Sequence, residues 1–454
     1  MFMLQRTDIK LLLILAIPLI LSGLVESSVG FFSTLFLAHL GQDELAAGAL
    51  VNWVFATLMV VLWGVLSAVS VAVAHKHGAQ DHGGVGQVFR DSLWLAVLFS
   101  IPASLLIWNL APLLVLLGQS PAVVRLAIPY LHALSWGLLP DFAGIVLLQL
   151  LIGLGQTRTS MGYTMVWVPM NIMVNYILVF GKCGFPAFGL AGLGWGMTFS
   201  FWVTSVGLLG FLWLRPFYGQ YCRLLLTLFH WGKIWELVKN GLPIGLMYCV
   251  EIAFFTVMML CMGHLGSKTL AANQVAMQYL GLFIAVVFAI AQAITVRVSN
   301  RLGAKEPIAA HRGVSAGLLI MVVIIGVIAV AEYFGATILI GFDFNRQDPG
   351  NTQLIAQATF FLELSLVVLF TESIRFALFG ALRGLKDTRF TLLVSLISFW
   401  GIALPLGYLF AYKLDLGGAG FWYGFMISSS LSVLTLFWRY RVKIEQQLRS
   451  PKTL

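Results

Sequence analysis

Apolar stretches of roughly 20 to 30 residues recur from one end of this chain to the other, and they limit its fold more than any other feature. Each is long enough to cross a bilayer as a helix. Hydrophobic residues make up 60% of the 454 and charged residues only 10%, whereas about 25% are charged in ordinary globular proteins. A soluble chain could not cover this much apolar surface. The sequence therefore predicts an all-α integral membrane protein.

Marking these stretches between polar residues and Gly or Pro breaks predicts twelve transmembrane helices. Their expected ranges are 10–38, 45–74, 91–117, 123–154, 159–181, 189–214, 236–263, 269–299, 312–342, 352–382, 390–412 and 417–438. The longest polar connector separates six helices from six. It predicts an N-lobe at 1–214, a cytoplasmic amphipathic linker at 215–235 and a C-lobe at 236–454.

Lysine and arginine are distributed unequally across this topology. With both termini on one side of the membrane, 21 of the 27 basic residues lie on that side. Those opposite are Arg125, Lys182, Lys268, Arg346 and Lys413, and Arg375 falls inside a span. The positive-inside rule therefore predicts that both termini are cytoplasmic. Because the basic residues form no continuous patch, we expect no nucleic-acid partner despite the net charge of +9.

The two groups of six helices are related in sequence. His39-Leu40-Gly41 returns as His264-Leu265-Gly266 at an offset of 225, and Gly153-Leu154 returns as Gly384-Leu385 at an offset of 231. Since six is an even number, both copies enter the membrane from the same side. The repeat predicts two six-helix lobes related by a pseudo-two-fold axis along the membrane normal, which is an architecture of transporters.

Five acids, Glu26, Asp141, Glu251, Glu363 and Glu372, lie deep in the predicted spans, and Glu332 lies less deep. An ionisable group at the bilayer centre costs about 2.5–3.5 kcal/mol on insertion scales, so each is a functional candidate. The repeat offsets pair Glu26 with Glu251 and Asp141 with Glu372. A carboxyl in a low-dielectric cavity is suited to take up and release a proton, and it can equally bind Na⁺ through oxygen. We predict the four paired acids as cation-coupling residues, with Glu251 and Glu372 as the candidate Na⁺ ligands.

Polar, aromatic and methionine side chains accompany these acids. Ser22, Glu26, Gly30 and Ser33 share one helical face, and Tyr248 lies one turn before Glu251. A cavity of amides, aromatic rings and a few carboxylates suits a lipophilic cation, which prefers aromatic faces and one counter-charge. The predicted substrate-binding residues are Tyr248, Phe255, Met259, Gln274, Gln278, Asn171, Asn175, Ser33 and Arg375.

Structural roles for the same residues stay open. A buried acid can simply be hydrogen-bonded to its neighbours. Arg375 lies three residues after Glu372 on one helix and could neutralise it. Tyrosine and methionine at helical spacing often serve packing.

Several short motifs occur together in the second half of the chain. They are Gly241-Leu242-Pro243 ahead of Glu251, Leu265-Gly266, Ala271-Ala272-Asn273-Gln274, Arg297-Val298 before Leu302-Gly303, Leu382-Arg383-Gly384 before Asp387, and Pro405-Leu406-Gly407-Tyr408. On this set the chain resembles the multidrug and toxic compound extrusion family along nearly its whole length, most closely its bacterial NorM-like branch. The resemblance implies antiport of organic cations or other xenobiotics against H⁺ or Na⁺ across the bacterial inner membrane.

The resemblance also bears on single residues. It implies that Glu251 and Glu372 match the family's acids on the seventh and tenth helices, which couple cation binding to export. Three positions depart from the family: Ser33 stands where many members carry Asp, Asn175 where some carry an acid, and Val368 where some sodium-coupled members carry Tyr. These departures favour H⁺ over Na⁺ and a C-lobe coupling site over an N-lobe one.

Other functions fit this pattern less well. A flippase for lipid-linked precursors, the main alternative, is expected to have fourteen helices and a basic cavity. An intramembrane enzyme would need a paired catalytic set, and no His-Glu-x-x-His occurs. A channel filter would use a ring of charges rather than isolated acids. The cysteines Cys183, Cys222, Cys249 and Cys261 lack paired spacing, so we expect neither a disulfide nor a metal site, no cofactor, and a monomer.

Overall fold

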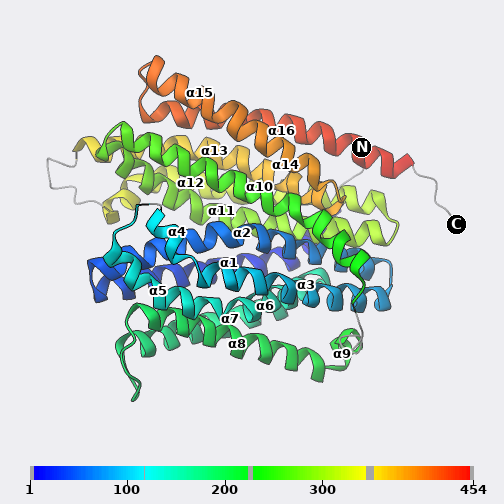
Figure 1. Ribbon diagram of the computed structural model, residues 1–454. Coiled ribbons are helices and arrows are strands. Elements are labelled where there is room, and N and C mark those ends of the chain that lie inside the picture. The colour runs from blue at the N-terminus through cyan, green and yellow to red at the C-terminus, as the bar shows by residue number, and fades with distance from the viewer. Residues whose placement is uncertain (1–4, 117, 223–228, 344–351, 450–454) are drawn as a thin grey trace. The chain divides into compact units, whose positions relative to one another are not determined.

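The computed structural model describes residues 5–116, 118–222, 229–343 and 352–449, and all regular structure within these ranges is helical (Figure 1). The elements in chain order are α1 (Arg6–Leu40), α2 (Gln42–Gly78), α3 (His82–Trp108), α4 (Ala111–Leu116), α5 (Pro121–Ser135), α6 (Leu138–Gly153), α7 (Thr157–Phe180), α8 (Leu190–Leu214), α9 (Pro216–Cys222), α10 (Trp231–His264), α11 (Ser267–Gly303), α12 (Pro307–Asp343), α13 (Thr352–Gly384), α14 (Thr388–Leu396), the π-helical η3 (Ile397–Ala403), α15 (Leu404–Tyr408), the π-helical η4 (Leu409–Lys413) and α16 (Gly418–Arg449).

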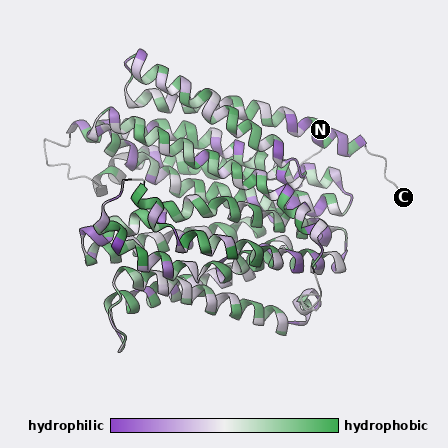
Figure 2. Ribbon diagram, in the orientation of Figure 1, coloured by the Kyte–Doolittle hydropathy of each residue, from purple (hydrophilic) through white to green (hydrophobic). Residues whose placement is uncertain are grey.

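Eleven spans among the described residues are long and apolar enough to cross a membrane, with α14 to η4 counted as one, and the bent pair α5 and α6 supplies a twelfth. Apolar residues occupy most of the length of these helices, and hydrophilic residues gather toward several ends, including the C-terminal part of α16 (Figure 2). The predicted all-α membrane fold is thereby confirmed.

The predicted single helix at 123–154 is wrong, because α5 and α6 meet at an angle of 49°. Pro140 has no N–H to donate to the carbonyl of Trp136, four residues earlier. That carbonyl instead accepts a hydrogen bond from Trp202 Nε1 at 3.2 Å, and the carbonyl of Ala133 accepts one from Thr198 Oγ1 at 2.7 Å. Side chains of α8 therefore satisfy the backbone that the bend releases, as a break inside a membrane requires.

Several helices extend beyond the predicted spans. The helix predicted to begin at 91 begins at His82, since Asp81 caps it by accepting a hydrogen bond from Gly84 N at 2.7 Å. The Lys76 ammonium, which donates to the other carboxylate oxygen, and this cap hold the pKa of Asp81 below its usual value. That helix ends at Trp108, and residue 117, its predicted end, lies outside the described residues. Spans read from hydropathy alone omit such polar ends.

The described chain divides into two compact units, residues 17–245 and residues 1–16 with 246–454. The divisions fall inside α1, just before Pro18, and inside α10, just after Pro243. Each of these two helices therefore contributes to both units. The N-lobe at 1–214 and the C-lobe at 236–454 stay a prediction from the sequence. Residues 223–228 of the predicted linker lie outside the described residues, and the rest of it contains α9 and the start of α10.

The repeat is visible in polar contacts within each unit. An ion pair joins Lys76 and Asp81 at 2.9 Å, and the pair at the offset of 225, Arg301 and Glu306, lies at 2.6 Å. Both connect the end of one long helix to the start of the next. The two copies thus retain the same kind of helix-end contact although the residues differ.

A second repeated contact anchors the first turn of α1 and of α10. The carboxylate of Asp8 lies 3.3 Å from Arg297 Nη2 and 3.5 Å from Arg312 Nε. At the offset of 225, Lys233 corresponds to Asp8 and donates to Gln87, which corresponds to Arg312. Both copies thus have a polar contact at this position, but the acid of the first contact is replaced by a base in the second.

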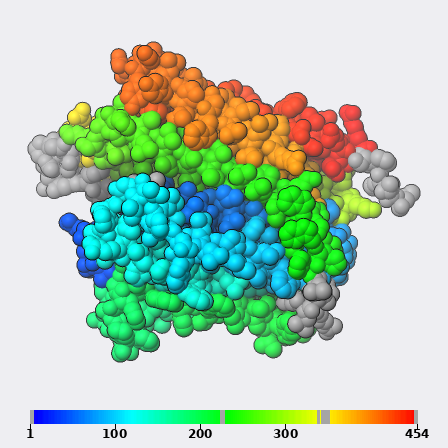
Figure 3. Space-filling view, viewed as in Figure 1, coloured from blue at the N-terminus to red at the C-terminus, as the bar shows by residue number. Residues whose placement is uncertain are grey.

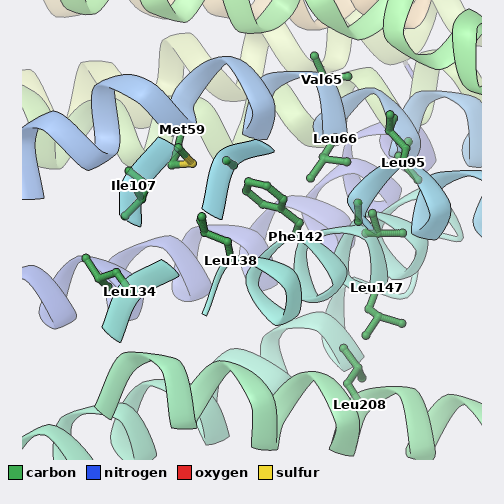
Figure 4. Packing of buried hydrophobic residues seen from close by; sticks show 14 of the residues in the cluster. Met59, Val65, Leu66, Leu95, Ile107, Leu134, Leu138, Phe142, Leu147 and Leu208 are labelled. Carbon is green, nitrogen blue, oxygen red and sulfur yellow. The ribbon is translucent and has the colours of Figure 1, made fainter. Parts of the chain in front are cut away.

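The core of residues 17–245 is formed mainly by side chains of α2, α3, α5 and α6. Figure 4 shows Phe142 of α6 among Leu66 of α2, Leu95 of α3 and Leu138 of α6. All four side chains are at most 2% exposed. Burial of one such side chain contributes about 1.5–3 kcal/mol in water, but helices that leave lipid for each other gain mainly from close packing.

Glycines allow α2 to pass very close to the first half of α10. A Cβ on Gly64 would overlap the backbone of Gly245, and a Cβ on Gly245 would overlap the carbonyl of Val61. A Cβ on Gly241 would lie 2.5 Å from the carbonyl oxygen of Val65. Small residues at such a crossing let two membrane helices pack backbone to backbone.

The substitution Gly245→Ala is expected to destabilise the protein by about 1–3 kcal/mol, because the added methyl must push α2 and α10 apart. Thermal unfolding in detergent should show this as a lower midpoint. Gly210→Ala in α8 is the matched control, since a Cβ there would meet nothing within 4 Å. Equal midpoints for the two variants would contradict the close crossing.

The segment from α14 to η4 carries apolar side chains on its outer side. Leu393, Leu396, Ile397 and Tyr408 are exposed, and this segment is the orange surface in Figure 3. Exposed aliphatic side chains on a spanning segment are suited to contact lipid. Its inner side carries Ser395 and Phe399, which are buried.

Candidate cation-coupling site

Two of the predicted acids meet inside the unit formed by residues 1–16 and 246–454. Glu251 is placed by α10 and is 7% exposed, while Glu372 is placed by α13 and is 2% exposed. Arg375 follows Glu372 by three residues on the same face of α13 and is also 2% exposed. The three side chains form one buried cluster, which we call the Glu251–Arg375–Glu372 triad.

The guanidinium of Arg375 bridges the two carboxylates. Its Nε donates to both oxygens of Glu372 at 2.9 Å, and its Nη2 also donates to Glu372 Oε2. Its Nη1 donates to Glu251 Oε1 at 2.8 Å. Such multiple charge-assisted bonds from a planar guanidinium are strong and geometrically specific. Glu372 is therefore held on both oxygens, whereas Arg375 holds Glu251 on one.

Two serines complete the hydrogen bonding of the carboxylates. Ser429 of α16 donates to Glu372 Oε1 at 2.6 Å, and Ser395 of α14 donates to Glu251 Oε1 at 3.3 Å. Neither serine was among the residues predicted from the sequence. The available signal was a serine inside an apolar helix, since such side chains often bond across helices in membranes. Ser395 also lies just before the π-helical η3, and π-turns frequently accompany functional sites.

Aromatic rings surround the guanidinium. Its central carbon lies 4.9 Å from the ring centre of Phe376, 4.7 Å from that of Phe379 and 5.0 Å from that of Phe399. These distances are within the range of cation–π attraction. These three rings therefore stabilise a cation of the protein itself. The aromatic residues predicted from the sequence, Tyr248 and Phe255, were assigned to a substrate cation instead.

The charge of the triad follows from its composition. Two ionised carboxylates and one guanidinium sum to one negative charge, and uptake of one proton by either carboxylate makes the cluster neutral. Burial of an uncompensated charge costs several kcal/mol, so a buried site of this kind favours binding of one positive charge. Among the described residues, no group of three or more His, Cys, Asp or Glu side chains could hold a metal ion.

The remaining predicted residues near the triad differ in their surroundings. The guanidinium of Arg383 lies 5.0 Å from the ring centre of Tyr248. Phe255 packs edge-on against Phe425, with ring centres 5.5 Å apart. Met259 is half-buried, whereas Gln274 and Gln278 are exposed on α11. Phe255 is thus a packing residue in this conformation, and the two glutamines are free to contact a ligand.

The acids of residues 17–245 have neutral partners. Glu26 is exposed on α1 and accepts from Thr164 Oγ1 at 3.1 Å. Asp141 is half-buried at the start of α6 and accepts from Trp63 Nε1 at 3.0 Å. Neither carboxylate forms an ion pair among the described residues. The acids that the repeat pairs with Glu251 and Glu372 therefore lack an equivalent of Arg375.

The predicted amides of α7 bond to each other. Asn175 Nδ2 donates to Asn171 Oδ1 at 2.9 Å, and both side chains are buried. Asn175 also packs on Gly196 of α8, where a Cβ would overlap its amide oxygen. Ser33 is buried on α1. In this conformation the asparagines join α7 to α8 and do not line an open surface.

A cavity of about 500 Å³ lies between α7 and α8 in the same unit. Its lining is mostly apolar and includes Tyr163, Val166, Met170 and Phe211. None of the predicted site residues lines it. The cavity is thus separate from all four predicted coupling acids.

A serine-hydrolase pattern, Gly313-Val314-Ser315-Ala316-Gly317, lies within α12. A nucleophile in this motif needs a sharp turn between a strand and a helix. Ser315 instead lies in continuous helix and donates to the carbonyl of His311 at 3.2 Å. This geometry exposes no nucleophile.

Comparison with known proteins agrees with the fold and the motifs. The MatE family model matches residues 18–177 and 243–409, which is more than half of the chain. The chain belongs to the MatE family. The resemblance seen in the sequence is confirmed, and the protein is a membrane transporter, not an enzyme.

Curated MatE relatives are similar along almost the whole chain. A probable multidrug resistance protein NorM of Synechocystis sp. is 32% identical over 442 residues, covering 96% of this chain and 95% of that protein. A protein of the same description from Pseudomonas aeruginosa is 33% identical over 424 residues, covering 92% and 86%. These relatives come from bacteria, and with the spans described they indicate a multi-span protein of the cytoplasmic membrane.

Solved structures share the fold. A multidrug resistance MATE transporter in an outward-facing conformation superposes with a TM-score of 0.86 at 20% identity, covering 98% of this chain and 97% of that one. A eukaryotic MATE transporter superposes with a TM-score of 0.84 at 20% identity, covering 97% and 98%. At these identities the likeness establishes the fold alone.

Proposed function

We propose that this MatE protein exports organic cations, drugs among them, in exchange for protons by alternating access. Its NorM relatives are described as multidrug resistance proteins, which supports the choice of substrate class. The observation that carries the proposal is the buried Glu251–Arg375–Glu372 triad, in which two carboxyl groups share one guanidinium. We further propose that the protein acts as a monomer with both termini cytoplasmic.

Glu251 is the exchanging member of the triad in this proposal. Glu372 is held on both oxygens by Arg375 and bonded by Ser429, whereas Glu251 accepts through Oε1 and is the more exposed of the two. Ionised Glu251 gives an organic cation its counter-charge when the site opens to the cytoplasm. Opening to the outside lets a proton bind Glu251, which removes that counter-charge and releases the cation. Competition for one carboxylate couples the two movements.

Protons suit the triad better than Na⁺. A sodium ion needs several oxygen ligands, and three of the four carboxylate oxygens already accept hydrogen bonds from Arg375. Na⁺ would also lie beside the guanidinium, a like charge. A flippase for anionic lipid-linked precursors would need a basic group free to bind the anion, and at the triad the guanidinium of Arg375 is paired with two carboxylates.

Proteoliposomes test the proposal directly. Movement of a fluorescent organic cation such as ethidium should follow an imposed pH gradient and should be unchanged when Na⁺ is replaced by choline. Glu363→Gln, at an exposed acid on α13, is a matched control and should transport normally. Transport driven by a Na⁺ gradient at equal pH would overturn proton coupling, and movement driven by neither gradient would overturn cation export.

A further inference from the structure

Another buried acid lies away from the triad. Glu332 is on α12 and is 2% exposed. It is the only acid or base of α12 between Arg312 and Asp343. The helices α11, α13 and α16 pack on α12; α16 has no charged residue before Arg439, and α11 has none between Lys268 and Arg297. Among the described residues of these three helices, no charged side chain other than those of α13 lies near the middle of α12, so an ionised Glu332 would have an apolar environment.

On α13 the charged residues are Glu363, Glu372, Arg375 and Arg383. Glu363 is exposed, and the next two belong to the triad. Glu332 forms no ion pair with any of them, and Tyr333, its neighbour in sequence, is exposed. Among the described residues, its hydrogen-bonding neighbour is Ser365 of α13.

The hydrogen bonds of Ser365 favour the protonated form of Glu332. Ser365 Oγ lies 2.7 Å from the carbonyl oxygen of Leu362 and 3.4 Å from Glu332 Oε1. A serine hydroxyl has one hydrogen, and the shorter bond to the Leu362 carbonyl uses it. The remaining lone pairs of Ser365 can only accept. The contact with Glu332 is then satisfied if the carboxyl supplies the hydrogen.

The second oxygen of Glu332 points to the same conclusion. Oε2 is buried and has no hydrogen-bond partner within the part of the chain that the structure describes. An ionised carboxylate with one long hydrogen bond and one oxygen without a partner would have the full desolvation cost of a buried charge. A neutral carboxyl leaves only one carbonyl oxygen unpaired, which costs much less. From this geometry we propose that Glu332 is a second proton-binding site, separate from the triad and built at the contact of α12 with α13.

The site is placed to act together with the triad. Ser365 and Glu372 are seven residues apart on α13, which puts them on one face about 10 Å apart along the axis. A movement that separates α12 from α13 would expose Glu332 and free its proton, while the packing seen here retains it. This inference concerns a proton site that the proposed antiport mechanism does not require.

Infrared difference spectroscopy of the full-length protein in lipid tests the site without any transport assay. At pH 7 the wild type minus Glu332→Gln spectrum should contain one protonated carboxyl C=O band that shifts in D₂O. Ser365→Ala should move that band to higher frequency, since the carboxyl loses its acceptor. Glu363→Gln, at an exposed acid on α13, should leave the Glu332 band in place.

Three results would overturn the proposal. The first is a folded Glu332→Gln protein that loses carboxylate bands and no C=O band, which would mean that Glu332 is ionised in the wild type. The second is disappearance of the C=O band on addition of Na⁺ at constant pH, which would make Glu332 a sodium ligand. The third is an unchanged band in Ser365→Ala, a variant that keeps Glu332 and therefore serves if Glu332→Gln does not fold. Failure of proton-driven export with the band present would overturn only the proposed function.

Discussion

Replacing Arg375 with methionine should cost about 3–5 kcal/mol of stability, because it leaves two buried carboxylates without their shared counter-charge. Methionine has a similar length and keeps contact with the surrounding phenylalanines, so the main change is loss of charge and hydrogen bonds. Folded proteins have only about 5–15 kcal/mol in total. We therefore expect Arg375→Met to lower the thermal midpoint in detergent sharply and to reduce the yield of monodisperse protein.

A second substitution separates charge from packing in this prediction. Glu372→Gln in the Arg375→Met background removes one of the two unpaired carboxylates and should recover part of the lost stability. Glu372→Gln alone leaves Arg375 paired with Glu251 and should cost less than Arg375→Met. Arg375→Lys should be intermediate, since a lysine retains the charge and lacks the planar fork. If Arg375→Met unfolds at the wild-type temperature, the triad does not depend on its guanidinium.

The sequence predicted the residues of the triad better than their arrangement. Glu251 and Glu372 stood out as acids in apolar helices, and spacing alone made Arg375 a candidate partner for Glu372. That the same guanidinium also reaches Glu251 on α10 depends on how α10 and α13 pack. Such contacts between distant helices leave no periodic signal in a single sequence.

The contacts of other predicted site residues also depend on tertiary packing. Asn171 and Asn175 were predicted to line a cavity, yet both are buried and Asn175 Nδ2 donates to Asn171 Oδ1 one turn away. The bend between α5 and α6 was different, since Pro140 marked it in the sequence. The sequence could not show that Trp202 donates to the carbonyl of Trp136, because this contact depends on how the helices pack.

Alignment of the two copies shows which residue makes their charge different. The offset of 231 that aligns Asp141 with Glu372 also aligns Gly144 with Arg375. Gly144 has no side chain to pair with Asp141, and a Cβ there would lie 2.7 Å from Ser205 Oγ. The N-terminal copy is therefore packed where the C-terminal copy carries a guanidinium. The two copies share their helical arrangement, but among the described residues only the C-terminal copy has the cluster of two acids and an arginine that we propose exchanges protons.

The Glu251→Gln variant should abolish proton-coupled export while leaving the protein folded. The glutamine carbonyl can still accept from Arg375 Nη1, and Arg375 remains paired with Glu372, so the cost should stay near the 1 kcal/mol of a typical hydrogen bond. With Glu372 ionised the triad would then carry no net charge, and position 251 could neither attract a cation nor exchange a proton. Drug-stimulated proton release from proteoliposomes should fall to the rate of protein-free vesicles.

Matched variants of the N-terminal copy make this result specific. Glu26→Gln and Asp141→Asn remove the acids that the repeat relates to Glu251 and Glu372, and each replaces a carboxylate bonded to a neutral donor. Because neither acid belongs to a charged cluster, we expect both variants to retain proton-coupled export, with reduced rates at most. Unchanged proton release in Glu251→Gln would contradict the assigned role of the triad. Its loss in Glu26→Gln or Asp141→Asn would move the coupling site to the N-terminal copy.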